Sequence, residues 1–362
     1  MSSPTCRFCR APLTRTFLDL GDQPLANSYL TPEQLAAGAE PVFPLHTRVC
    51  DRCFLVQADH EVPAEAIFDE GYAYFSSFSP GWVEHARRYA EAMTERFGLG
   101  PESLVVEVAS NDGYLLKHFL GKDIPVLGIE PTANTAEAAR AVGVRTDVVF
   151  FNAETGQKLA ARGDRADLMA ANNVLAHVPD LNAFVGGFRH VLKPDGVLTF
   201  EFPHLLNLIE KVQFDTIYHE HYSYLSLLAV EQVLAAHGLR VFDVEQLPTH
   251  GGSLRIYARH RGAPGPIGHS VGEMRARERG AGFDDLFTYR GFAERVKMVK
   301  RGLLSFLIEA KFAGKKVAEL KPDYILILPW NLKDEIMGQL AYIRDWGGRF
   351  VVASPETKVL AK

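Results

Sequence analysis

Apolar residues follow two spacings along this chain, and the change between them predicts where strands and helices lie. Between residues 103 and about 200, short apolar runs alternate with amphipathic stretches that carry apolar residues at helical spacing. This alternation predicts βαβ units, and therefore a parallel sheet with helices on both faces. The predicted strands are Leu104–Val108, Val126–Ile129, Val144–Val149, Leu168–Ala171 and Val197–Phe202.

Two more strand-like runs follow this region, Val241–Gln246 and Ser253–Arg259. The short turn between them contains Gly251 and Gly252, which is typical of an antiparallel hairpin. The last strand of the sheet is therefore predicted to be antiparallel.

Helical spacing surrounds the predicted sheet. Trp82–Phe97 reads as a helix that Gly98 stops. Residues 263–282 are rich in Gly, Pro and charge and indicate a linker or an exposed helix, and helical spacing returns over Phe283–Ala313. A small C-terminal α/β unit is predicted from two strands and a helix between them: Tyr324–Leu328, 332–346 and Arg349–Ala353.

A length of 362 residues suggests two or three domains, and 47% hydrophobic content is enough for well-formed cores. We expect a cysteine-bearing domain over 1–70, a central Rossmann-like domain over 71–262 and a C-terminal α/β domain over 263–362.

All four cysteines lie in the first 53 residues, as the pairs Cys6/Cys9 and Cys50/Cys53. Outside an oxidising compartment this spacing indicates metal binding, with four free cysteines as the alternative. Four thiolates are the ligand set of tetrahedral zinc, and they leave no open position for water, so we expect a structural role. The surrounding segment is rich in loops and proline, and a metal would fix it.

Polar or small residues follow the predicted strands, at the edge where ligands bind in open α/β sheets. The first strand leads into a turn and a helix near Tyr114, but the dinucleotide fingerprint G-x-G-x-x-G is absent, which disfavours an oxidoreductase. A plain strand-to-helix turn is the alternative. Glu130 ends the second strand and can accept hydrogen bonds from both ribose hydroxyls, and Phe150 and Phe151 can flank an adenine ring. The predicted cofactor-binding residues are Glu107, Ala109, Ser110, Asn111, Gly113, Glu130, Pro131, Phe151, Asn152, Asn172 and Asn173.

Residues 214–224 (FDTIYHEHYSY), which we call the His/Tyr tract, contain two His, two carboxylates and three Tyr. Histidine is the usual general acid or base near neutral pH, and tyrosine can orient it or donate a proton. The alternative is an aromatic cluster between domains whose histidines are all hydrogen-bonded. His177 lies just past the fourth strand and is either a helix-start residue or a second contact to substrate.

Two other segments carry candidate substrate contacts. The turn after residue 249 places His, Ser and Arg side chains where they can meet a phosphate or a sugar, although a plain hairpin needs no ligand. Aromatic and hydroxyl residues near 72–79 lie at a domain junction, where packing alone is an equally good account. The candidate contacts are Tyr72, Tyr74, Ser77, His250, Gly251, Ser253 and Arg255.

The net charge of −5, with Lys and Arg scattered, disfavours nucleic acid as a partner and favours a small substrate. No run of about 18 apolar residues is present, and the N-terminal residues have no secretory apolar stretch, so we expect a cytoplasmic protein without membrane contact. The sequence leaves the oligomeric state open, with a monomer favoured.

Taken together, the motifs resemble the three-domain, SAM-dependent sugar C-methyltransferases of deoxysugar biosynthesis, where SAM is S-adenosylmethionine. The matching motifs are the paired cysteines, QPLANSYL (23–30), YAYFSSFS (72–79), EVASNDGYLL (107–116), GIEP (128–131), NNVLAHVPD (172–180), YHEHYSY (218–224), HGGSLR (250–255) and PDYILILPWN (322–331). The resemblance implies a zinc-binding N-terminal domain, a SAM-binding middle domain and a C-terminal domain that contributes to the sugar-nucleotide site. An antiparallel last strand agrees with the Rossmann-like methyltransferases.

The resemblance also implies a reaction, methylation at C-3 of a dTDP-linked 4-keto-deoxysugar through an enolate. In that reaction His221 would be the base, with Tyr218 and Glu220 orienting or stabilising, while His177 and Tyr72 would contact the sugar or the enolate oxygen. The alternatives are methylation at C-5 or another carbon of a related nucleotide sugar, methylation of oxygen, nitrogen or nucleic acid, and a non-catalytic SAM-binding protein with a zinc knuckle.

One departure from the family lies in the C-terminal domain. Such proteins usually carry a Gly-rich strand-turn-helix after the run that here reads Phe312–Ala318, but in this chain Ala318 passes directly to Glu319. Either the segment is absent from this sequence or this member is trimmed, so we predict no substrate residue in 312–322.

Overall fold

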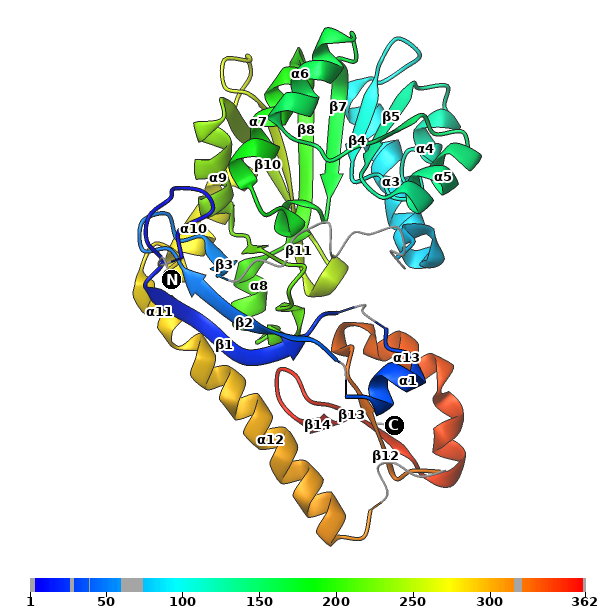
Figure 1. Cartoon of the computed structure of the whole chain (residues 1–362), viewed down its shortest axis with the longest axis vertical. Coiled ribbons are helices and arrows are strands. Elements are labelled where there is room, and N and C mark those ends of the chain that lie inside the picture. The colour runs from blue at the N-terminus through cyan, green and yellow to red at the C-terminus, as the bar shows by residue number, and fades with distance from the viewer. Residues whose placement is uncertain (1–3, 27–28, 39, 60–73, 316–320, 361–362) are drawn as a thin grey trace.

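A seven-stranded sheet forms one end of the molecule, a four-stranded sheet with strands from the N-terminal residues lies below it, and a three-stranded sheet near the C-terminus lies towards the other end (Figure 1). The structure is a computed structural model and describes residues 4–26, 29–38, 40–59, 74–315 and 321–360. Ala318 and Glu319, where the sequence departs from the family pattern, lie outside the described residues, and so does Tyr72.

The central sheet has the order β10-β11-β8-β7-β4-β5-β6. Its strands are β4 (Val105–Val108), β5 (Val126–Glu130), β6 (Thr146–Val148), β7 (Ala166–Asn172), β8 (Leu192–Pro203), β10 (Leu239–Leu247) and β11 (Ser253–His260). The five strands β8, β7, β4, β5 and β6 pair in parallel with their neighbours in this order. Strand β11 pairs antiparallel with both β8 and β10. The predicted fold class, a Rossmann-like sheet with an antiparallel last strand, is confirmed. The chain runs outward from β4 to β6 and returns to β7 on the other side of β4, and such a reversal opens a crevice for ligands.

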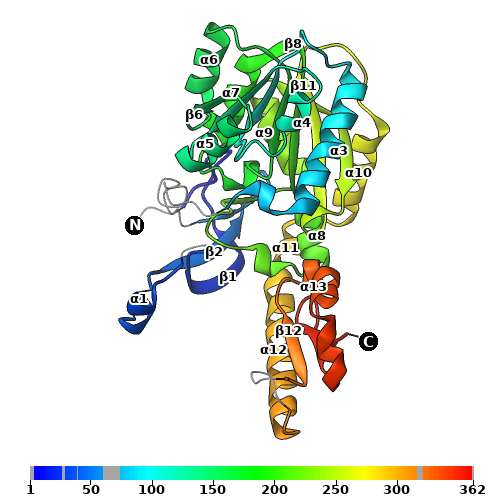
Figure 2. The same ribbon diagram turned by 90° about the vertical axis from the view of Figure 1, so that its right-hand side faces the viewer.

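Helices cover both faces of this sheet, as Figure 2 shows. They are α3 (Pro80–Phe97), α4 (Lys117–Leu120), α5 (Ala133–Ala141), α6 (Ala153–Ala161), α7 (Leu181–Val191) and α9 (Leu227–Ala236). Successive strand residues point to opposite faces, so Val105 packs with the core of α3, α4 and α5, and Val106 with that of α6, α7 and α9.

The helix predicted from Trp82 begins slightly earlier, at Pro80. The Ser79 hydroxyl accepts a hydrogen bond from the Trp82 backbone N–H, and Gly98, with φ 61°, ends the helix in a left-handed conformation. The helix predicted near Tyr114 begins only at Lys117, because the preceding turn contains residues with positive φ that cannot be helical.

The first 59 residues contain more strand than the sequence analysis expected. Three antiparallel strands and a short helix form there: β1 (Arg15–Pro24), β2 (Val42–Val49), β3 (Val56–Ala58) and α1 (Pro32–Ala36). The fourth strand of their sheet is β9 (Ser223–Tyr224), at the end of the His/Tyr tract. Phe17 of β1 stacks on Phe292, with ring centroids 4.7 Å apart, so this sheet shares its core with the C-terminal helices.

Helix α8 (Leu205–Glu210) follows β8, and the C-terminal part contains α10 (His269–Gly280), α11 (Leu286–Arg290), α12 (Phe292–Phe312), β12 (Tyr324–Ile327), α13 (Lys333–Gln339), β13 (Arg349–Val352) and β14 (Lys358–Val359). Short 3-10 turns lie at Ser76–Phe78, Leu175–His177, Phe214–Thr216, Thr249–Gly251, Trp330–Leu332 and Ala341–Trp346. The helical spacing predicted over Phe283–Ala313 corresponds to two helices, which meet at Gly291. Residues 263–282, where the sequence indicated a linker or an exposed helix, contain helix α10. Its Val271 and Met274 side chains are buried. In the described parts of the chain, no helix has both the length and the apolarity that a membrane span requires.

Candidate functional site

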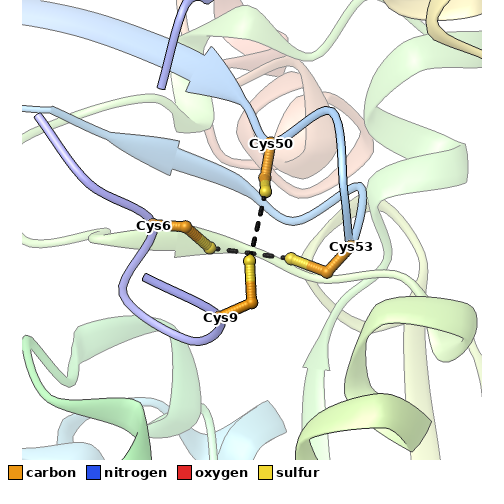
Figure 3. A group of neighbouring side chains, drawn as sticks. All are labelled: Cys6, Cys9, Cys50 and Cys53. Carbon is orange, nitrogen blue, oxygen red and sulfur yellow. Dashed lines mark hydrogen bonds between the residues drawn. The ribbon is translucent and has the colours of Figure 1, made fainter. Parts of the chain in front are cut away.

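The four cysteines converge in the N-terminal domain, as Figure 3 shows. Their sulfur atoms all lie within 4.8 Å of one another, with Cys6 Sγ 3.6 Å from Cys53 Sγ and Cys9 Sγ 3.5 Å from Cys50 Sγ. Zinc–sulfur bonds of about 2.3 Å in a tetrahedron place the sulfurs about 3.8 Å apart, so the cluster already has nearly the size that zinc requires.

The electrostatics of the cluster also fit a cation. Hydrogen bonds from Cys50 and Cys53 lower the pKa of Cys6 far below its ordinary value, whereas hydrogen bonds with Cys50 and Cys6 raise the pKa of Cys53. One thiolate among these sulfurs therefore opposes the ionisation of its neighbours. A divalent cation removes that conflict, and four sulfur ligands leave it closed to water, as in structural zinc sites.

A cavity of about 620 Å³ opens at the carboxyl ends of β4, β5 and β7, where the strand order reverses. Most of the predicted site residues line it. They are Tyr74, Ala109, Asn111, Glu130, Pro131, Phe151, Asn152, Asn172, Asn173, His177, Tyr218, Glu220, His221 and His250. The predicted cofactor side and the predicted base therefore share one cavity.

Glu130, at the end of β5, is a buried acidic group on one side of this cavity. Its carboxylate accepts hydrogen bonds from the backbone N–H groups of Asn111 (2.8 Å) and Thr132 (3.0 Å). Burial raises the pKa of Glu130 in spite of these two donors. The Asn111 side chain in turn accepts from the Ser76 N–H and donates to the Tyr74 carbonyl, which ties the segment before α3 to the turn after β4.

Two carbonyl oxygens in the cavity wall have no hydrogen-bond partner among the described residues. They are the side-chain oxygens of Asn172 and Asn173, at the end of β7, and both are shielded from solvent. Buried acceptors are rarely left without a donor, so these two atoms point to a ligand or water that donates to them. Asn173 also has a positive φ of 52°, a strained conformation that is common at functional sites.

His221 is held by both ring nitrogens. Nδ1 lies 2.9 Å from the Thr216 carbonyl, which can only accept, so Nδ1 carries the proton. Nε2 therefore has the free lone pair and accepts from the Tyr218 hydroxyl at 3.0 Å. Burial lowers the pKa of His221 to about 4 and lowers that of His177 well below its ordinary value. The two imidazoles lie edge to face with centroids 4.6 Å apart, and both are neutral at pH 7.

Seven predicted site residues lie outside the described cavity lining. Ser77 binds Asp112 through its hydroxyl and backbone N–H, and Arg255 pairs with the buried Glu201 at 2.8 Å. A Cβ at Gly113 would meet Val144 at 3.0 Å, so this glycine allows close packing onto the β5–β6 region. Glu107, Ser110 and Ser253 are buried, and Gly251 faces other protein groups. Their roles stay predictions, as does that of Tyr72.

The cavity also contains aromatic residues that the sequence analysis did not assign to it. Trp82 packs edge to face with His250, with centroids 5.2 Å apart, and lies 5.9 Å from the Tyr114 ring. Both residues were seen only as helix-start positions. The sequence feature that could have identified them is the presence of large aromatic residues near a turn of small residues. The cavity that they share depends on tertiary packing, which the sequence pattern does not show.

Comparison with known proteins agrees with this architecture. Three family models match: "Putative zinc binding domain" over residues 6–68, "Methyltransferase domain" over 82–244, and "C-methyltransferase C-terminal domain" over 248–320 and 315–355. The chain is 32% identical to the C-methyltransferase NovU of Streptomyces niveus, across 98% of this chain and 96% of that relative. The chain belongs to this C-methyltransferase family. It is a SAM-dependent enzyme with a zinc-binding N-terminal domain.

Two further comparisons cover only part of this chain. The ubiquinone biosynthesis O-methyltransferase of Rhodopseudomonas palustris (strain BisA53) is 24% identical over 38% of this chain and 62% of its own length. The magnesium protoporphyrin IX methyltransferase of Synechocystis PCC 6803 with bound SAH is 14% identical, covering 54% of this chain and 90% of its own, and its TM-score of 0.39 is too low to support a conclusion.

The alignment with NovU is longer than this chain. The alignment runs over 407 positions, more than the 362 residues of this chain, so NovU contains segments without a counterpart here. The C-terminal family model matches in two parts that meet near residues 315–320, where the sequence departs from the family pattern.

Proposed function

We propose that this C-methyltransferase transfers its methyl group to C-3 of a dTDP-linked 4-keto-deoxysugar. The observation that supports this most directly is the His/Tyr tract, since His221, Tyr218 and Glu220 line the same cavity as Glu130. A base beside the cofactor is what methylation of a carbon acid needs, whereas oxygen and nitrogen acceptors need less help from a base. The sugar class rests on the resemblance of YHEHYSY and HGGSLR to the sugar C-methyltransferases.

The cavity residues fit SAM, which supplies a methyl group carried on a positively charged sulfur. We assign its ribose to Glu130, because the two backbone donors hold that carboxylate in place and leave it further lone pairs. Phe151 and Asn152 would contact the adenine. The unpaired side-chain oxygens of Asn172 and Asn173 would accept hydrogen bonds from the cofactor.

His221 would remove the C-3 proton. The ketone at C-4 acidifies this C–H bond, the Tyr218 hydroxyl turns away from Nε2 when the substrate is bound, the C-3 proton passes to the freed Nε2 lone pair, and the electron pair of the C–H bond is shared over C-3, C-4 and the ketone oxygen. SAM, held at Glu130, Asn172 and Asn173, would supply the methyl group that C-3 takes up in place of this proton. Before the substrate binds, Tyr218 orients the imidazole through its hydrogen bond to Nε2, and Glu220 lies beside them in the wall. His177, kept neutral by burial, would contact the enolate oxygen.

The nucleotide end of the substrate would lie outside the cavity. Among the described lining residues there is neither lysine nor arginine, although a diphosphate carries negative charge. We therefore assign the sugar to the cavity and the nucleotide to its mouth, toward the C-terminal domain. This assignment uses the proposed division into domains over 1–70, 71–262 and 263–362. Strand β9 of the second domain pairs with the sheet of the first.

The decisive experiment is mass spectrometry of reactions with SAM and a panel of dTDP-4-keto-deoxysugars in D₂O. The native enzyme should methylate one panel member and exchange its C-3 hydrogen for deuterium. His221→Asn should lose both reactions, by at least about 100-fold, and still bind SAM. His269→Asn, at an exposed position, is the control. Full activity of His221→Asn would remove this base from the mechanism, and exchange at C-5 alone would overturn the C-3 assignment.

A further inference from the structure

The C-terminal domain contacts the loop that leads into the His/Tyr tract. The Trp330 indole Nε1–H donates to the Asp215 carboxylate at 2.9 Å, and the Ser354 hydroxyl donates to the Val212 carbonyl at 3.1 Å. Burial of Asp215 raises its pKa, although the indole hydrogen bond lowers it. Both acceptors lie just before Tyr218 in the chain, so the domain holds the start of the segment that carries the proposed base.

The same indole also lies against the turn that carries His250. A Cβ at Gly251 would be 2.7 Å from Trp330 Cη2 and 2.7 Å from Gln213 Nε2, so any side chain there would displace one of them. Gln213 is 2% exposed and donates to the Gly251 carbonyl at 2.9 Å. Trp330 therefore lies between two loops and contacts both.

Each of these loops continues into a side chain of the cavity wall. Thr216, which follows Asp215, provides the carbonyl that fixes the Nδ1–H of His221 at 2.9 Å. His250, which precedes Gly251, lies edge-on to Trp82 in the wall. A movement of Asp215 would carry the Thr216 carbonyl with it and turn the imidazole away from its hydrogen bond to Tyr218.

We propose that Trp330 is a positioning residue for methyl transfer, through which the C-terminal domain holds His221 and His250 in their working geometry. The indole does not line the cavity and acts through Asp215 and Gly251. This inference rests on the proposed function of His221 as the base. It gives the C-terminal domain a part in the reaction that is separate from any contact with the nucleotide.

Trp330→Phe keeps an aromatic ring and removes the hydrogen bond to Asp215. The matched control is Trp346→Phe, because Trp346 makes the same kind of bond at 3.0 Å to the Pro322 carbonyl, inside the C-terminal domain. Both variants are made in the full chain and assayed with the panel sugar that the native enzyme turns over fastest. We expect kcat to fall about 10- to 100-fold in Trp330→Phe, because small misplacements of catalytic groups have effects of this size. KM for SAM should be unchanged, and Trp346→Phe should keep native kcat.

Asp215 variants separate positioning from folding. Asp215→Asn keeps an acceptor for the indole and should retain most of the native kcat, whereas Asp215→Leu should match Trp330→Phe. The double variant Trp330→Phe/Asp215→Leu should be no slower than either single variant, because all three lose the same interaction. If Trp330→Phe keeps native kcat, or loses only as much kcat and thermal stability as Trp346→Phe, the inference is wrong.

The inference and the proposed function fail in different ways. Inactive His221→Asn together with a native kcat in Trp330→Phe would overturn the positioning role alone. Fully active His221→Asn together with a slow Trp330→Phe would overturn the assignment of the base and leave the positioning of His250 supported.

Discussion

Val56 of the cysteine-bearing domain pairs with Tyr224 at the end of the His/Tyr tract, in the antiparallel ladder of β3 and β9. The neighbouring Gln57 is opposite Ser223, is completely buried, and donates to the sulfur of Cys6 at 3.3 Å. A short path of contacts therefore connects a zinc ligand to the strand that follows His221. The zinc-binding domain supports the tract directly, although it lies outside the central sheet.

Removal of zinc should therefore affect the tract before it affects the central sheet. Without the metal, the cysteine knuckles lose their common anchor, and β3 should no longer hold β9 in register. We expect a chelator to abolish methyl transfer and to increase hydrogen exchange over residues 222–224. Amides of β5, in the middle of the central sheet, serve as the internal control. Native activity in a sample shown by metal analysis to be free of zinc would contradict this coupling.

The buried His221 makes a second prediction, about stability and pH. Its pKa falls from 6.5 to about 4 on folding, so between these values only the unfolded chain binds this proton. The free energy of unfolding should therefore decrease as the pH falls below 6.5, by about 1.4 kcal/mol per pH unit for this group. His177 and His250, whose pKa values are also lowered by burial, add to the slope.

The measurement is urea denaturation at pH 7 and pH 5 for the native protein and for His221→Asn. The loss of unfolding free energy between the two pH values should be about 2 kcal/mol smaller in His221→Asn, since one proton-binding difference has been removed. His269→Asn, exposed on α10, should behave like the native protein. An equal loss in all three proteins would show that His221 is not buried as a neutral imidazole.

Glu130 makes a third prediction, for cofactor affinity. In Glu130→Gln, an N–H₂ group replaces one carboxylate oxygen and faces the backbone N–H of Asn111 or Thr132, so the side chain must turn or lose a bond. We expect the Kd of S-adenosylhomocysteine (SAH), the product that SAM leaves after methyl transfer, to rise roughly 10- to 100-fold when measured by calorimetry. Glu154→Gln, at an exposed position on α6, should bind like the native protein. A native Kd in Glu130→Gln would move the ribose elsewhere in the cavity.

Local patterns in the sequence predicted which side chains would lie together at this edge of the sheet. Glu130 and Asn172 end buried parallel strands, and the ends of such strands meet at one edge of a sheet, so their shared cavity was predictable. The pairing of β9 with β3 was not, because a two-residue strand has no periodicity, and its partner lies more than 160 residues earlier in the chain. Nor could spacing show that Gly251 faces Trp330, since that contact depends on how the C-terminal domain docks.

Arg255, a predicted substrate contact, is part of a buried network of charged groups. Its guanidinium donates to Glu201 at 2.8 Å and to Glu245 at 3.1 Å, while Glu201, which is completely buried, also bonds His85 and the Thr249 hydroxyl. Burial alone would raise the pKa of Glu201, but His85 and Arg255 outweigh it and lower the pKa. The network also holds the turn that carries His250, because Thr249 directly precedes that residue.

Arg255→Met should therefore act on stability. It leaves the Glu201 carboxylate buried without its permanent cation, and breaking such a pair typically costs about 3–5 kcal/mol. We expect a loss of this order in urea denaturation, and a smaller loss in Arg255→Met/Glu201→Leu, where neither charge of this pair remains. Arg259→Met, on the same strand but bonded to exposed carbonyls, is the control. If Arg255 instead contacts the sugar nucleotide, Arg255→Met should raise the KM for the sugar and keep native stability. The stability and KM measurements together therefore decide between a structural and a substrate-binding arginine.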